Sequence, residues 1–229
     1  MQTAGSPPAG DTAHGGGSSE VEGGVSLGDL FRVHRGQVTG ANHAWVVPTP
    51  HPLVPARFQP PCVTRARDLM SCGGVLREER GLRRVIALPV DLDEIPQEAR
   101  PDVERFLDLL RSQGVPDGYV ARHRSAWWAV RLREPAPILM TYMARRPPIF
   151  VQNFAQARHI NIAHGLYPRK PRSDEELAGY TSWLNENVSM GSGRTYAGGL
   201  TKFEPGEVMR LTVPRPSAVL AWARAQKDA

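Results

Sequence analysis

The stretch from Tyr142 to Tyr196 places the strongest constraint on the fold, because its apolar runs are short and broken. Arginines, histidines, an asparagine and aromatic residues alternate with these runs, and acids are scarce until Asp174. Short apolar runs between polar residues favour strands over long helices. The stretch therefore predicts a β-rich scaffold with a basic, aromatic-interleaved surface, which suits a polyanion that also has bases to read.

The positive charge of the chain is concentrated in one segment. The formal net charge over 229 residues is +5, yet acids and bases nearly balance outside residues 122–172. Within that segment Glu134 alone opposes the basic residues, which are Arg122, Arg124, Arg131, Arg133, Arg145, Arg146, Arg158, Arg169, Lys170 and Arg172. A local excess of this kind favours contacts to phosphate groups. The sequence therefore predicts a nucleic-acid partner.

The cysteines and the apolar runs bear on compartment. Cys62 and Cys72 have neither CxxC spacing nor histidine partners at zinc-finger spacing. A zinc site or a disulfide framework is therefore not expected, and a reducing cytosol is the default. No apolar run approaches the roughly 20 residues that span a bilayer, and the N-terminus lacks signal-peptide features. We expect a cytoplasmic protein with no membrane partner.

Composition divides the chain in two. Residues 1–25 are mostly Gly, Ser, Pro, Ala and Thr, and cannot bury enough apolar surface to offset their ordering entropy. They are expected to form a disordered tail, and residues 26–229 a single folded domain.

Three segments carry helix signals. Pro101–Ser112 has acids in its first turn and apolar residues at helical spacing, and Gly114 follows it. Ser173 and Glu176 form a capping box that opens a second helix through Asn185. A third helix is expected from about Ser217.

The remaining apolar runs predict strands. The expected strands are residues 30–33, 44–47, 83–90, 127–132, 138–144, 149–151 and 208–213. The first two would flank a polar loop, residues 35–42, and the strands at 127–132 and 138–144 would pair. In that pairing Trp127 and Trp128 would point to opposite faces. The predicted class is α+β, with mixed or antiparallel strands and a few packing helices.

Three blocks in this order carry a family resemblance. The first is Phe31-Arg32-Val33 with residues 35–42, which have the pattern Arg-Gly-x-x-Thr-Gly-x-Asn. The second is residues 142–150 followed by 158–166, and the third is residues 191–205 with 211–214. Together they resemble the C-terminal target-recognition region of amino-type, adenine-specific DNA methyltransferases of bacterial restriction–modification systems, the TaqI-type arrangement. The resemblance implies a domain that reads double-stranded DNA and leaves catalysis to another domain.

Candidate DNA contacts follow from residue chemistry and from the three blocks. Arginine pairs with guanine and asparagine with adenine, while backbone N–H groups and hydroxyls in a loop at residues 191–196 would clasp phosphate. The candidates are Arg35, Thr39, Asn42, Arg145, Arg158, His159, Asn161, His164, Arg169, Ser192, Arg194 and Lys202. The alternatives are core histidines at 159 and 164, a turn residue at 161, a plain loop at 35–42 and a helix cap at 191–196.

The resembled enzymes also carry motifs that this sequence does not match. A Gly-rich loop for S-adenosylmethionine follows an early strand in them, whereas Gly191-Ser192-Gly193 follows a helix. Their Pro-Pro-aromatic motif holds a flipped adenine, but Ser6-Pro7-Pro8-Ala9 has no aromatic residue. We therefore expect no catalytic residues and no cofactor in this chain, with S-adenosylmethionine bound only by a partner catalytic domain.

Other interpretations stay open at this point. The chain could be a protein-interaction module or a truncated remnant that needs a separate methyltransferase chain. It could also be a cryptic methyltransferase or a nuclease. A metal cluster at His159, Asn161 and His164 is not expected, because no acid lies nearby.

Overall fold

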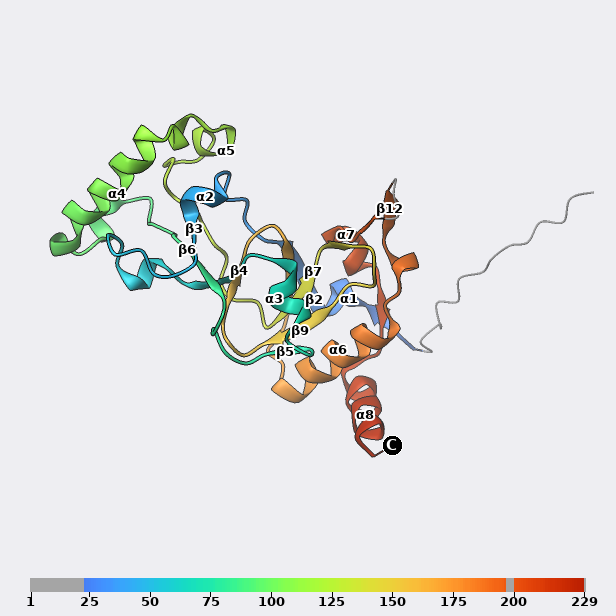
Figure 1. The fold of residues 1–229 in the computed structure, drawn as a ribbon. Helices are drawn as coiled ribbons and strands as arrows, with labels where there is room; N and C mark the ends of the chain where they lie inside the picture. The colour runs from blue at the N-terminus through green and yellow to red at the C-terminus, as the bar shows by residue number, and fades with distance from the viewer. Residues whose placement is uncertain (1–22, 197–199, 229) are drawn as a thin grey trace, which may run out of the picture.

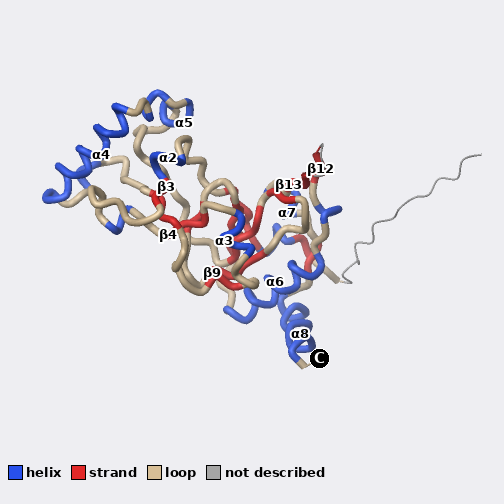
Figure 2. Tube along the Cα trace, viewed as in Figure 1, coloured by secondary structure: helices blue, strands red, loops and turns tan. Residues whose placement is uncertain are grey.

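The computed structural model describes residues 23–196 and 200–228, which form a mixed α+β fold of two lobes (Figure 1). Strands occupy the centre and helices lie mainly at the periphery (Figure 2). Residues 1–22, which include most of the expected tail and the Ser-Pro-Pro-Ala sequence, lie outside the described part, as do residues 197–199.

The larger lobe is built on a five-stranded sheet of order β2-β11-β7-β9-β5. Its strands are β2 (Phe31–Arg35), β11 (Ala163–Pro168), β7 (Ile138–Thr141), β9 (Phe150–Asn153) and β5 (Val75–Leu76). All neighbours are antiparallel except β5 and β9, which are parallel. Every residue of β7 and β9 is buried, because helices and loops cover the sheet on both faces.

Four helices belong to the larger lobe. They are α1 (Leu27–Leu30), α6 (Asp174–Asn187), α7 (Pro205–Met209) and α8 (Pro216–Lys227). A small sheet joins β1 (Val25–Ser26) to β14 (Thr212–Val213), and another joins β12 (Arg194–Tyr196), β13 (Leu200–Lys202) and β8 (Met143–Ala144). The core of this lobe includes Phe31, Phe150 and Tyr180, all fully buried.

The smaller lobe holds a four-stranded sheet of order β10-β4-β6-β3. Its strands are β10 (Arg158–His159), β4 (Pro61–Val63), β6 (Arg83–Val85) and β3 (Val46–Val47). Its helices are α2 (Asn42–Trp45), α4 (Arg100–Ser112) and α5 (Tyr119–Arg122), and α3 (Ala66–Met70) follows β4. Trp45 centres the core, with its ring centroid 6.2 Å from that of Phe106 and 6.1 Å from that of Trp127.

Short 3-10 turns complete the described structure. They are η1 (Ala56–Phe58), η2 (Leu92–Glu94), η3 (Gln97–Ala99), η4 (Val115–Asp117) and η5 (Met190–Ser192). No helix within residues 23–196 or 200–228 is long and apolar enough to cross a bilayer.

The helices with local signals form as expected. The Ser173 hydroxyl accepts a hydrogen bond from the Glu176 N–H at 3.2 Å, and a Glu176 carboxylate oxygen accepts one from the Ser173 N–H at 3.1 Å. This confirms the capping box. Leu177, Tyr180 and Leu184 are buried, as the spacing predicts.

Of the predicted strands, one does not form and others form only in part. Residues 42–45 form helix α2, and β2 and β3 belong to different sheets, so no hairpin forms there. Residues 127–132 have no strand, because their backbone bonds to itself from Val130 to Trp128 and from Leu132 to Val130. Helix α7 (Pro205–Met209) takes in Val208 and Met209 of the strand predicted at residues 208–213, and only Thr212–Val213 of that strand pairs.

Two further elements differ from the predictions. Trp127 and Trp128 pack against each other with centroids 5.8 Å apart and both join the smaller core, so they do not occupy opposite faces. Residues 194–196, predicted as part of a loop, form strand β12.

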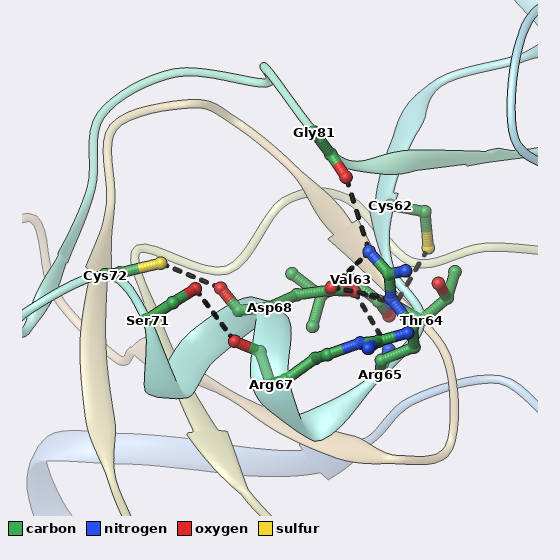
Figure 3. Close-up of polar contacts among 9 residues, drawn as sticks. All are labelled: Cys62, Val63, Thr64, Arg65, Arg67, Asp68, Ser71, Cys72 and Gly81. Carbon is green, nitrogen blue, oxygen red and sulfur yellow. Dashed lines mark hydrogen bonds and ion pairs between the residues drawn. The ribbon is translucent and has the colours of Figure 1, made fainter.

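Asp68 fastens α3 to β4 (Figure 3). Its carboxylate accepts hydrogen bonds from the Thr64 N–H at 3.1 Å, the Arg65 N–H at 3.0 Å and the Arg65 Nε at 2.8 Å. Arg65 also reaches the Gly81 carbonyl oxygen at 3.4 Å. The carboxylate therefore stabilises the start of the helix and ties it to the loop before β6.

Both cysteines are free thiols. Burial raises the pKa of the Cys62 thiol, and burial followed by the Asp68 charge raises the pKa of the Cys72 thiol. The Cys72 thiol donates to the Asp68 carbonyl oxygen at 2.8 Å. In the part of the chain that the structure describes, no group of three His, Cys, Asp or Glu side chains is arranged to hold a metal ion.

Candidate nucleic-acid interface

The two lobes meet where β10 reaches the ends of β2 and β11. The segment after β2, residues 36–41 (the junction loop), runs beside residues 160–162. The Gly36 N–H donates to the Ala163 carbonyl oxygen at 3.0 Å, and the Asn161 N–H donates to the Gln37 carbonyl oxygen at 3.1 Å. A β-carbon at Gly36 would overlap the carbonyl group of Ile160. Glycine at position 36 therefore allows the backbone at Ile160 of the same chain to lie close to the loop.

Arg124 holds the junction loop from the other side. Its Nη2 donates to the carbonyl oxygens of Val38 at 2.9 Å and Thr39 at 2.8 Å. Thr39 is buried, and its hydroxyl bonds the side chain of Asn42. Gly40 has φ +76° and lies against Val120 of α5, a conformation that a residue with a β-carbon rarely adopts. The loop is therefore held between α5 and β10.

A second group, the Tyr142 cluster, lies at the end of β2. It consists of Arg35, Tyr142, His164, Lys202 and Glu204. The Arg35 guanidinium carbon lies 5.0 Å from the centre of the Tyr142 ring and the Lys202 ammonium 5.3 Å from it, both within cation–π range. The His164 ring lies 4.8 Å from the same ring.

An ion pair sets the charge of this cluster. Lys202 Nζ lies 2.5 Å from Glu204 Oε1. The hydrogen bond between them raises the pKa of Lys202 and lowers the pKa of Glu204. Arg35 is exposed and has the remaining positive charge. The cluster therefore presents a net cation on a rigid aromatic support, which suits a phosphate oxygen.

Several of the sequence-predicted residues come together here. Arg35 and His164 are paired by register on β2 and β11, and Arg194 lies opposite Lys202 in the backbone pairing of β12 and β13. Asn161 lies half-buried beside the junction loop, and Asn42 is exposed at the start of α2. These residues are contributed by segments far apart in the chain.

Other predicted residues lie elsewhere or serve the fold. The Arg158 guanidinium donates to the carbonyl oxygens of Leu132 at 3.1 Å and Arg133 at 2.7 Å, and to Glu134. Arg169 Nε donates to the Gly28 carbonyl oxygen at 2.6 Å, Ser192 lies in η5, and Arg145 is exposed just after β8.

The two histidines of the second block lie in the interior. His159 is 2 % exposed and His164 is fully buried, with Nε2 of His164 bonded to the Phe203 carbonyl oxygen at 2.8 Å. The His159 ring lies close to both Gly36 and Gly165: a β-carbon there would be 2.7 and 2.8 Å from it. Both rings pack inside the junction between the lobes and are too buried to contact a base.

Burial also sets their charge. Burial lowers the pKa of His159 to about 4. The nearby His34 backbone raises it by a smaller amount. Neither ring nitrogen of His159 completes a hydrogen bond. Burial lowers the pKa of His164 as well. Both rings are therefore neutral at pH 7 and do not attract phosphate.

The depressed pKa of His159 predicts a loss of stability in mild acid. The unfolded chain binds a proton near pH 6.5 whereas the folded chain resists it down to about pH 4, so stability falls as pH decreases through this window. The free energy of unfolding in urea should drop by about 2 kcal/mol from pH 7 to pH 5. His159→Gln should lose that share of the pH dependence, and an unchanged pH profile in this variant would refute the assignment.

Sequence reasoning missed part of this surface. Tyr142 and Glu204 lie within the second and third blocks, so their position in those blocks could have marked them. Tyr119 and His123 are both exposed beside the junction loop, but α5 has four residues and carries no helix signal of its own.

Comparisons with known proteins match the chain to one part of type II methyltransferases and of a restriction endonuclease. Residues 19–228 match the family model described as type II methyltransferase M.Eco57I, C-terminal domain. The type II methyltransferase M.XamI of Xanthomonas campestris pv. amaranthicola is 54 % identical over 194 residues, which are 85 % of this chain and 37 % of the relative. The chain thus spans little more than a third of that relative.

A solved structure shares the fold. The type IIG restriction endonuclease BpuSI superimposes with a TM-score of 0.56 at 13 % sequence identity, over 89 % of this chain and 26 % of BpuSI. At that identity the likeness extends to the fold alone, and here too the matched part is a fraction of a longer protein.

Proposed function

The chain belongs to the family of the C-terminal domain of type II methyltransferase M.Eco57I, and we propose that it recognises the DNA target of such an enzyme. The observation that carries this proposal is the position of the Tyr142 cluster next to the junction loop. The cluster offers the exposed Arg35 and the half-buried Lys202 on a rigid support, and the loop is flanked by exposed or half-exposed amides.

The proposal gives these residues separate roles. Arg35 and Lys202 hold the phosphate backbone, with Arg145 after β8 and Arg194 on β12 as further cations. Asn42 and Asn161 read base edges, because a carboxamide pairs with adenine through two hydrogen bonds. Thr39, Arg158, His159 and His164 act indirectly by fixing the loop and strands that carry these groups. Arg169 and Ser192 are left as contacts at the edges of the surface.

The same proposal assigns methyl transfer to another part of the enzyme. S-adenosylmethionine would bind in a catalytic domain. That domain would be on a separate chain, or it would correspond to the part of a relative such as M.XamI that this chain does not match. Residues 26–229 would act as one DNA-binding unit on double-stranded DNA in the cytoplasm, and adenine would be the methylated base.

Salt-dependent binding to duplex DNA tests the proposal. Fluorescence anisotropy on a random duplex should show affinity that falls with salt at a slope near −0.9 per phosphate contacted. Arg35→Ala and Lys202→Ala should each weaken binding several-fold and flatten the slope by about 0.9. Arg224→Ala is the matched control, since Arg224 is an exposed, ion-paired arginine on α8.

The outcomes are distinct. Loss of affinity in the Arg35 and Lys202 variants with an unchanged Arg224 variant supports the proposed surface. Equal losses in all three variants would mean that binding depends on net charge alone. An absence of binding by the native chain at low salt would refute the proposed function.

A further inference from the structure

Tyr119 stands out on the surface of the smaller lobe. Its side chain is 73 % exposed, more than any other large apolar side chain among the described residues. Folding gains little from an aromatic ring left in water. His123 nevertheless supports the ring on one side. The centroids of the two rings are 4.3 Å apart with an interplanar angle of 37°, and His123 Nδ1 lies 2.6 Å from the Tyr119 carbonyl oxygen.

The chain fixes Tyr119 firmly beside the junction loop. Val115 and Ala121 anchor the segment in the interior, and Val120 lies against Gly40. Just after α5, Arg124 bonds two carbonyl oxygens of the junction loop. The exposed ring is therefore presented from a fixed base next to the proposed DNA surface.

The surroundings of Tyr119 are basic and polar. Arg122 and His123 are exposed beside it, and Asp117 is the one acid in residues 115–124. Asn42 and His43 are exposed on α2, directly after the loop on which α5 packs. Figures 1 and 2 show α5 and β12 rising on the same side of the molecule, one from each lobe. An open aromatic ring close to an exposed arginine suits a nucleobase and its phosphate.

We propose that Tyr119, supported by His123, is a stacking platform for an unpaired base of the bound DNA. The inference rests on the proposed function and extends it to a residue outside the three sequence blocks. One face of the phenol ring contacts His123, and no second ring contacts it among the described residues. An unpaired base completes that stack, whereas a paired base inside a duplex has no free face to offer.

The test compares two DNA ligands and three variants of the full chain. Anisotropy is measured on a fully paired duplex and on the same duplex with one bulged nucleotide, at fixed salt. Stacking tolerates any base, so the recognised sequence need not be known. Tyr119→Ala should weaken binding to the bulged duplex about tenfold and to the paired duplex much less. Tyr119→Phe, which keeps the ring, should bind the bulged duplex within about twofold of the native chain.

Phe154→Ala is the matched control, since Phe154 is an exposed aromatic residue, 43 % accessible, that follows β9. It should bind both ligands as the native chain does. If Tyr119→Ala binds the bulged duplex with unchanged affinity, or loses equal affinity for both duplexes, the stacking role is overturned. In that case, binding of the paired duplex by the native chain still upholds the proposed function. A native chain that binds neither duplex overturns both.

Discussion

Replacing Gly36 by alanine is expected to destabilise the protein by about 3 kcal/mol or more. The added methyl group would overlap the carbonyl carbon and oxygen of Ile160 and press on the His159 ring. Backbone atoms cannot move aside as a flexible side chain does. Relief would require the junction loop to leave Ile160, which breaks the hydrogen bond from the Asn161 N–H to Gln37. Urea unfolding monitored by tryptophan fluorescence measures the loss.

Gly206→Ala provides the control for this prediction. Gly206 lies in α7, and a β-carbon there meets nothing within 4 Å. Because alanine favours a helix over glycine, this variant should be as stable as the native protein or slightly more so. A Gly36→Ala protein with native stability would show that the loop and the Ile160 backbone are not in such close contact.

Asp68→Ala is expected to cost a similar amount, about 3 kcal/mol. The change removes the acceptor of three hydrogen bonds and leaves the Thr64 and Arg65 N–H groups and the Arg65 guanidinium without it. A buried donor that loses its partner carries its full desolvation cost. Thermal or urea unfolding should show the loss, with α3 and the start of β6 affected first in hydrogen exchange.

The comparison for Asp68 is Asp102→Ala. Asp102 pairs with Arg105 one turn further along α4, where the Arg105 side chain is 68 % exposed and the Asp102 side chain 43 %. Exposed pairs contribute between zero and about 1 kcal/mol. If the two variants lost equal stability, the burial of the Asp68 carboxylate would have no energetic role.

Local signals explain which helices could be predicted from the sequence. The capping box at Ser173 and the acids and proline at the start of Pro101–Ser112 act within one helical turn, so they need no knowledge of the rest of the fold. Both helices form at the expected places, and the α+β class follows from them together with the short apolar runs.

The strands could not be placed with the same accuracy. Strands β3, β5, β8 and β10 have two residues each, and their pairing partners lie far away in the chain. Residues 44–47 and 127–132 look like strands by composition, but one begins as a helix and the other fills the smaller core. Periodicity alone cannot separate these cases in runs of four to six residues.

The candidate site shows the same division. Residue chemistry and the resemblance marked Arg35, His164 and Lys202, which the fold does bring together. The sequence does not reveal that His159 and His164 are enclosed, because the groups that enclose them belong to other strands and to Phe203. The sequence did not mark Tyr119 as a candidate, because its exposure depends on how α5 packs against the junction loop.

The His159 ring, set between Gly36 and Gly165, has a consequence for target choice under the proposed function. The ring packs closely against both glycines where the lobes meet, which restrains the separation between the Tyr142 cluster and Tyr119. A duplex that reaches both would have to match that separation, and any bending or unwinding that this requires has a cost that depends on base sequence. Flexible base steps would then be favoured at positions where no side chain touches the DNA. The protein would select such sites by the stiffness of the DNA.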